Sequence, residues 1–201
     1  MSKPLDFYFD FSSPYGYLAA MRIDDLAARY GRTVAWHPVL LGPVFKSTGG
    51  APLLTIPMKG AYSLYDIQRT ARFHKIPYNH PTPCPIATHA AARAMLWIRE
   101  AKGDDQAIAF AKAVFSAYFA DGVHIGEAEN VLAIGEQLGI DRAALGEGMA
   151  SQPIKDRLKA DVDQAMARGV FGAPFIFVDD EPFWGFDRFD QIAATLANGK
   201  I

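Results

Sequence analysis

The sequence FYFDFSSPYGY, residues 7–17, joins an aromatic run to two serines and a proline. Aromatic residues favour strands, and we predict a buried strand from Leu5 to Phe11. Proline disfavours the α region in the residue before it and suits the first position of a helix. Because serine is also a good N-cap, we place Ser13 at a switch from strand to helix, with the helix running from Pro14 to Tyr30.

The predicted position of Ser13 has two interpretations. Unpaired backbone N–H groups and the positive end of the helix dipole favour an anion at the start of a helix. The Ser13 hydroxyl then belongs to an anion-binding site. The alternative is that Ser13 only caps the helix, and this stretch alone does not decide between the two.

Composition and charge exclude several classes of partner. The 201 residues are 50% hydrophobic and 21% charged, which is ordinary for a globular protein. A net charge of -2 gives no electrostatic reason to bind nucleic acid or an anionic membrane. No apolar run approaches the roughly 20 residues of a transmembrane helix, and the first residues do not resemble a signal or transit peptide. We expect a cytoplasmic protein with no nucleic-acid or membrane partner.

The cysteine and histidine content points away from disulfide and metal chemistry. Cys84 is the single cysteine, so no internal disulfide can form, and a reducing compartment fits. Because it lies between prolines, we expect an inert or buried thiol rather than a nucleophile. We predict no metal site, since the histidines show no metal-ligand spacing; they are His37, His74, His80, His89 and His124.

Strand signals lie at the two ends of the chain. Residues 33–41 are β-branched and apolar, so the first forty residues predict a βαβ unit with parallel strands. Residues 42–58 are rich in glycine and proline and predict a loop. Residues 174–178 and 182–185 flank a polar turn and predict a hairpin, which a last helix over 188–197 follows.

The middle of the chain has helical periodicity and no strand signals. We expect helices at residues 62–73, 86–97, 104–120, 127–138, 141–150 and 152–168, with Asp141 and Ser151 as caps. The sequence thus predicts an α/β, thioredoxin-like fold with a large inserted all-helical domain. Residues 1–42 and 169–201 are then the two halves of the thioredoxin-like domain, and residues 43–168 are the insertion.

Two motifs together carry a family resemblance over nearly the full length. The first is the FYFDFSSPY motif at residues 7–15, and the second is VFGAPF at 170–175 followed by WGFDR at 184–188. In this order they resemble the 2-hydroxychromene-2-carboxylate isomerases, which are relatives of kappa-class glutathione transferases and of the DsbA oxidoreductases. The resemblance implies glutathione as cofactor, an aromatic small-molecule substrate and a homodimer.

The same resemblance implies roles for particular residues. Ser13 stands where the oxidoreductases keep the first cysteine of Cys-x-x-Cys, and in the isomerases that serine contacts the glutathione sulfur. Ala173 and Pro174 match a cis-proline loop that pairs with the cysteinyl group of glutathione. Four residues match the segment that holds the γ-glutamyl end of glutathione: Trp184, Gly185, Phe186 and Asp187. Lys46 falls where the isomerases place a lysine near the substrate carboxylate.

The residues also depart from the family and leave alternatives open. Cys-x-x-Cys is absent, which excludes dithiol exchange, and asparagines that approach the substrate in the isomerases have no clear counterpart. Asp187 has the alternative of capping the last helix, and Lys46 that of a solvated loop lysine. We also expect aromatic side chains in a substrate cleft or, for most of them, in the core or a dimer surface; these are Phe45, Tyr62, Tyr65, Tyr78, Trp97 and Phe183.

The chemistry expected of Ser13 is to stabilise a thiolate. A serine hydroxyl can donate a hydrogen bond to a bound thiolate, and the helix N-terminus adds positive potential. Lowering a thiol pKa from about 8.5 by about two units makes thiolate the majority form at pH 7, and is worth roughly 2.7 kcal/mol. Such a thiolate supports isomerisation by reversible addition to an activated C=C bond. The alternatives are a kappa-type glutathione transferase that releases the adduct, or a glutathione- or peptide-binding module without catalysis.

Overall fold

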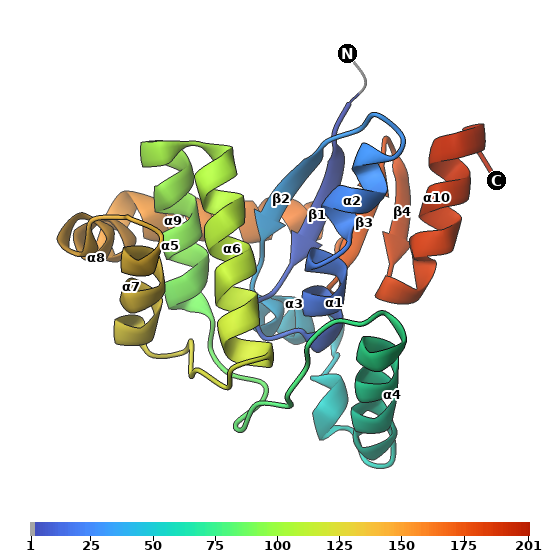
Figure 1. Ribbon diagram of the computed structural model, residues 1–201, viewed down its shortest axis with the longest axis horizontal. Coiled ribbons are helices and arrows are strands. Elements are labelled where there is room, and N and C mark those ends of the chain that lie inside the picture. The colour runs from blue at the N-terminus through green and yellow to red at the C-terminus, as the bar shows by residue number, and fades with distance from the viewer. Residues whose placement is uncertain (1–2) are drawn as a thin grey trace.

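The computed structural model describes residues 3–201 and contains one four-stranded sheet in the order β2-β1-β3-β4 (Figure 1). β1 (Leu5–Phe9) pairs in parallel with β2 (Val34–Pro38), with Leu5 opposite Val34. On its other side β1 pairs antiparallel with β3 (Phe175–Val178), and β3 forms a hairpin with β4 (Glu181–Trp184). Strands from both ends of the chain thus join in one sheet, and the predicted thioredoxin-like pattern is confirmed.

The first connection contains two short helices where the sequence predicts one. α1 (Pro14–Ala20) and α2 (Ile23–Ala28) are separated at Arg22, which leaves helical geometry at φ -134° and ψ -19°. The Arg22 guanidinium donates hydrogen bonds to the carbonyl oxygens of Met21 and His74. These contacts hold the break in place and include a residue 52 positions away, which local sequence does not reveal.

The segment predicted as a loop over residues 42–58 is largely helical. It contains α3 (Leu41–Thr48) and the 3-10 helix η1 (Leu53–Thr55). Pro43 fits because it lies in the first turn of α3, where backbone N–H groups have no helical partner. The loop prediction was wrong because Asp10, 31 residues away, accepts a hydrogen bond from the backbone N–H of Leu41 and so supports the start of α3. β2 ends at Pro38 rather than at Leu41.

The remaining helices agree with the expected ones to within a few residues. They are α4 (Lys59–Phe73), α5 (His89–Lys102), α6 (Asp104–Phe119), α7 (Ala128–Gln137), α8 (Arg142–Ala150), α9 (Gln152–Ala167) and α10 (Phe189–Asn198), with the 3-10 helix η2 (Phe186–Arg188) before α10. Asp141 accepts from the backbone N–H of Ala144 as a predicted cap, whereas Ser151 makes no side-chain cap.

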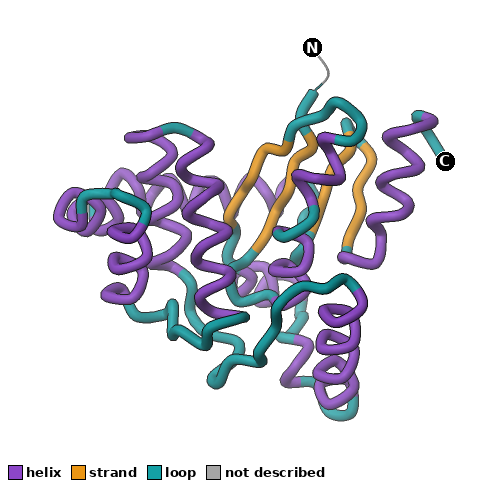
Figure 2. The backbone as a smooth tube through the Cα atoms, viewed as in Figure 1, coloured by secondary structure: helices purple, strands orange, loops and turns teal. Residues whose placement is uncertain are grey.

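Figure 2 shows the strands gathered between the large helical block and α10. In Figure 1, α5 to α9 form the block beside β2, while α3 and α4 lie at the end of the sheet where β1 stops and α1 starts. The proposed domain boundaries at residues 42 and 168 fall inside α3 and just after α9. No helix within residues 3–201 is both long and apolar enough to cross a bilayer.

An aromatic cluster joins the sheet to α6. The ring of Phe115 lies 5.0 Å from Phe11, 5.5 Å from Phe9 and 6.1 Å from Tyr17, measured between ring centroids. Phe9, Phe11 and Phe115 are all at most 1% exposed. The strand that leads to Ser13 is therefore anchored against the helical block directly beside the serine.

We predict that Phe115→Ala lowers the free energy of unfolding by about 3–5 kcal/mol, because it leaves a cavity among these rings. Tyr30→Ala removes an exposed ring and is expected to lower the free energy of unfolding by less than about 1 kcal/mol. Urea unfolding of the two variants measures both values. Equal costs would contradict the anchoring role of the cluster.

Candidate functional site

A cleft of about 1310 Å³ opens where the sheet, α1 and the segment from α3 to α5 meet. Residues of the start of α1 and the loops around β3 and β4 line one side. Apolar side chains of α3 and η1 line another side, including Leu41, Phe45, Leu53 and Leu54. Pockets for small molecules are concave, mostly apolar and carry a few polar groups, and this cleft has that composition.

Ser13 lies at the point of this cleft where β1 passes into α1. Its side chain is 7% exposed, and its Oγ accepts a hydrogen bond from the backbone N–H of Gly16 at 3.0 Å. The same hydroxyl donates to the carbonyl oxygen of Ala173 at 3.0 Å. Ser13 is therefore the N-cap of α1, as predicted, and it also contacts the segment before β3. The hydrogen bond to Ala173 plays no part in capping α1, so capping alone does not account for the position of Ser13.

The Ala173–Pro174 peptide bond is cis and lies against the serine. Two further cis bonds, Thr82–Pro83 and Cys84–Pro85, were not expected from the sequence. The carbonyl oxygen of Pro174 accepts from the backbone N–H of Gly185 at 3.1 Å, which ties the loop before β3 to the end of β4. The two motifs of the sequence analysis thus meet around Ser13.

The segment from Trp184 to Asp187 lines the same cleft. Gly185 has φ 109°, and a Cβ built there would lie 2.3 Å from Asp187 Oδ1, so the carboxylate folds back over the glycine. Asp187 is exposed, lies within η2 and makes an ion pair with Arg188 at 3.3 Å. The alternative that Asp187 caps the last helix is wrong, because Arg188 occupies the N-cap of α10 and no side chain caps either helix.

Lys46 is the one predicted site residue that the structure does not bring to the cleft. It lies in the last turn of α3, is exposed, and is absent from the cleft lining, whereas Lys59 at the start of α4 does line it. The resemblance that placed Lys46 near the substrate crosses the segment predicted as a loop, and the structure has Lys46 in α3 instead. Of the six aromatic candidates, only Phe45 lines the cleft.

Sequence reasoning missed several polar residues of the cleft. Asp10, Tyr15 and Asp66 line it, and the Tyr15 hydroxyl donates to Asp66 Oδ2 at 2.6 Å. Burial, reinforced by the hydrogen bond to Asp66, raises the pKa of Tyr15 well above its usual value, so the phenol stays protonated. Asp10 was part of the motif at residues 7–15, but two of its partners, Leu41 and Thr88, lie far away in the sequence.

Cys84 lies outside the cleft lining although its Sγ is 4.0 Å from the carbonyl oxygen of Ser12. Burial raises the pKa of the Cys84 thiol, which keeps it protonated at neutral pH. The structure favours the inert thiol over the nucleophile. Within residues 3–201 there is also no group of three or more His, Cys, Asp or Glu side chains that could hold a metal ion.

Comparison with known proteins agrees with this geometry. Residues 4–197 match the family described as DSBA-like thioredoxin domain. The chain is 33% identical over 198 residues to a 2-hydroxychromene-2-carboxylate isomerase of Sphingobium xenophagum, covering 98% of this chain and 99% of that protein. The chain belongs to this isomerase family within the DSBA-like proteins.

Two further proteins are similar to this chain, one in structure and one in sequence. A solved structure of a 2-hydroxychromene-2-carboxylate isomerase superposes with a TM-score of 0.86 at 31% identity, covering 96% of this chain and 94% of the other. Glutathione S-transferase kappa 1 of Caenorhabditis elegans is 27% identical, with 96% of this chain and 90% of that protein covered. The predicted family and its link to kappa-class transferases are confirmed.

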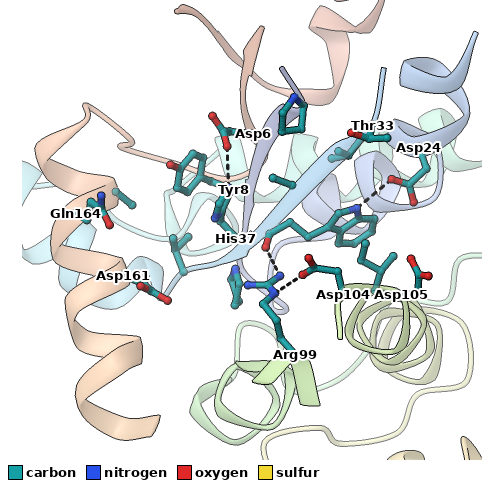
Figure 3. Close-up of a pocket in the computed structure, with 18 of the residues that line it drawn as sticks. Asp6, Tyr8, Asp24, Thr33, His37, Arg99, Asp104, Asp105, Asp161 and Gln164 are labelled. Carbon is teal, nitrogen blue, oxygen red and sulfur yellow. Dashed lines mark hydrogen bonds and ion pairs between the residues drawn. The ribbon is translucent and has the colours of Figure 1, made fainter. Parts of the chain in front are cut away.

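A second cavity, of about 1000 Å³, lies along the outer edge of β2 (Figure 3). Several of its polar side chains bind one another: His37 Nε2 lies 2.9 Å from Asp6 Oδ1, and Arg99 Nε lies 2.8 Å from Asp104 Oδ1. Burial lowers the pKa of His37 despite the nearby Asp6 carboxylate, so the imidazole is neutral, and it stacks on Tyr8 at 4.6 Å. These contacts give His37 a structural role, and the cleft around Ser13 remains the candidate site.

We predict opposite effects for two glycine substitutions. Gly185→Ala destabilises the fold by about 1–3 kcal/mol, because alanine at that φ is strained and its Cβ meets Asp187. Gly146→Ala, inside α8 with 3.7 Å to its nearest neighbour, stabilises by about 0.5–1 kcal/mol. Thermal and urea unfolding measure both. A Gly185→Ala variant as stable as wild type would contradict the close approach of the Asp187 carboxylate to Gly185.

Proposed function

We propose that this protein is a glutathione-dependent isomerase of the 2-hydroxychromene-2-carboxylate isomerase type. The observation that carries the proposal is the contact between the Ser13 hydroxyl and the Ala173 carbonyl within a cleft of about 1310 Å³. Its substrate would be an aromatic catabolic intermediate, which suits the apolar side chains of α3 and η1. A glutathione-containing, reducing compartment fits the single cysteine, and we propose a cytoplasmic location.

The residues around Ser13 fit a glutathione molecule. The Ala173 backbone, just before β3, offers an edge for the cysteinyl group, in the manner of a short added strand. The exposed Asp187 carboxylate suits the γ-glutamyl ammonium, with Trp184, Gly185 and Phe186 shaping that end. When bound, glutathione supplies a thiolate that adds reversibly to an activated C=C bond beside a carbonyl and so permits rotation about it.

Ser13 has a definite task in this scheme. Its hydroxyl donates to Ala173 in the structure, and it would turn that hydrogen bond to the sulfur when the cysteinyl N–H takes the Ala173 carbonyl. The start of α1 adds positive potential at the same point, which favours the thiolate form. Ser13 itself stays protonated and acts as a donor, not as a nucleophile.

The position of Lys46 leaves its proposed role open to test. We propose it for the substrate carboxylate on the family resemblance, although its side chain lies outside the cleft lining and Lys59 lies within it. A kappa-type glutathione transferase remains the second candidate function, and the specific observation in its favour is the 27% identity to a kappa enzyme. The two functions differ in whether the glutathione adduct is released as product.

We predict that Ser13→Ala lowers turnover by roughly 100-fold while glutathione binding changes by only a few-fold, because the lost hydrogen bond matters most for the charged sulfur. Ser63→Ala is the matched control, since Ser63 is a buried serine of α4 that donates to the Lys59 carbonyl. Calorimetry measures binding, and isomerisation of 2-hydroxychromene-2-carboxylate measures turnover. Unchanged turnover in Ser13→Ala, or turnover without glutathione, contradicts the proposal.

We also propose that the protein is a homodimer, as its family resemblance implies. The outer face of α4 carries large exposed apolar side chains, which monomers rarely gather in one patch; these are Met58, Tyr62, Tyr65 and Phe73. A second copy covering this face would place the interface beside the cleft, since Lys59 and Asp66 of the same helix line it.

Sedimentation velocity tests the α4 interface. Tyr65→Glu places a charge in the apolar patch and is expected to shift the protein to monomers. Gln137→Glu adds the same charge on the exposed end of α7 and is expected to leave the dimer intact. A monomeric wild type contradicts the dimer, and a dimeric Tyr65→Glu variant contradicts its placement on α4.

A further inference from the structure

Asp10 is a buried carboxylate at the edge of the cleft to which the scheme above gives no role. It is 4% exposed. Its Oδ1 accepts hydrogen bonds from the backbone N–H of Ser12 at 2.8 Å, from the Ser12 hydroxyl at 3.0 Å and from the Thr88 hydroxyl at 2.9 Å. Its Oδ2 accepts from the backbone N–H of Leu41 at 2.8 Å. Two amides and two hydroxyls thus satisfy both oxygens of the carboxylate.

These four donors come from the starts of three different helices. Ser12 directly precedes the N-cap of α1, Leu41 is the first residue of α3, and Thr88 is the N-cap of α5. Neither α3 nor α5 has a side-chain cap from its own N-cap residue. Asp10 provides a partner for α3 from 31 residues away, and its negative charge suits the positive ends of all three helices.

The three helix starts are also three walls of the cleft. The start of α1 carries Ser13, α3 carries the apolar surface of Leu41 and Phe45, and Thr88 lines the cleft from α5. The carbonyl oxygen of Asp10 in addition accepts from the backbone N–H of Ser13 at 2.9 Å. One residue therefore fixes the serine relative to the surface against which the aromatic substrate would lie.

We propose that Asp10 is a positioning residue, which sets the distance and direction between the Ser13 hydroxyl and the substrate wall formed by α3. The inference rests on the proposed function, since it concerns the same reaction. Asp10 touches neither the sulfur nor the substrate in this scheme and acts through Ser12, Leu41 and Thr88. A displacement of about 1 Å between reacting groups is enough to cost roughly 100-fold in rate.

The direct test is Asp10→Asn, which keeps the size of the side chain but replaces one acceptor oxygen by a donating NH₂ group. That group must face either the backbone N–H of Leu41 or that of Ser12, neither of which can accept a hydrogen bond, so the start of one helix loses its partner. We expect kcat to fall by at least about tenfold per glutathione-binding site, while the glutathione Kd and the substrate KM change by less than about threefold.

Counting the sites separates positioning from a merely structural role. The stoichiometry of glutathione binding in calorimetry gives the number of competent sites, and kcat is expressed per site. A structural role alone lowers the number of sites and leaves kcat per site within about twofold of wild type, which would overturn the inference. Asp6→Asn is the control, because Asp6 lies on β1, the strand that ends just before Asp10, and it bridges His37 and Arg168 away from the cleft. Its kcat per site is expected to match wild type even if its melting temperature falls.

Thr88→Val keeps the inference testable if Asp10→Asn does not fold, because it removes one donor and introduces no repelling group. We expect it to lower kcat per site by about threefold or more, and an unchanged kcat per site would overturn the inference. A wild type that binds no glutathione, or that binds it without isomerising 2-hydroxychromene-2-carboxylate, refutes the proposed function and this inference with it. A fully active wild type beside an equally active Asp10→Asn variant refutes the role of Asp10 alone.

Discussion

The hydrogen bond from the Ser13 hydroxyl to the Ala173 carbonyl joins two segments 160 residues apart in the chain. It forms because β1 and β3 pair directly, with Tyr8 opposite Phe175, so that the turn after β1 meets the loop before β3. The helical insertion therefore has to leave this pairing intact while it builds the other side of the cleft. The fold and the candidate site depend on the same pairing of strands from the two ends of the chain.

Local sequence was sufficient for the elements that build this contact. The aromatic run before Ser13, the proline after it and the hairpin near the end each follow short-range rules, and the structure has all three. The two motifs named in the sequence analysis also supplied nearly all the residues that gather around Ser13. Short-range rules did not predict that the two motifs lie side by side in the fold. That prediction came from the resemblance to a known family.

The errors have a common physical cause, which is that long-range contacts override local signals. α3 begins where glycine and proline suggested a loop, because Asp10 binds its first N–H from the end of β1. The break between α1 and α2 is held by a carbonyl of His74. In both cases the deciding hydrogen bond joins residues more than 30 positions apart in the sequence.

The central claim is that Ser13 and Ala173 together receive the glutathione sulfur and its cysteinyl backbone. A crystal structure of the protein grown with glutathione tests it most directly. The account predicts the sulfur within about 3.5 Å of Ser13 Oγ and the cysteinyl N–H bonded to the Ala173 carbonyl. Glutathione bound elsewhere, or bound here with its sulfur directed away from Ser13, would contradict the account.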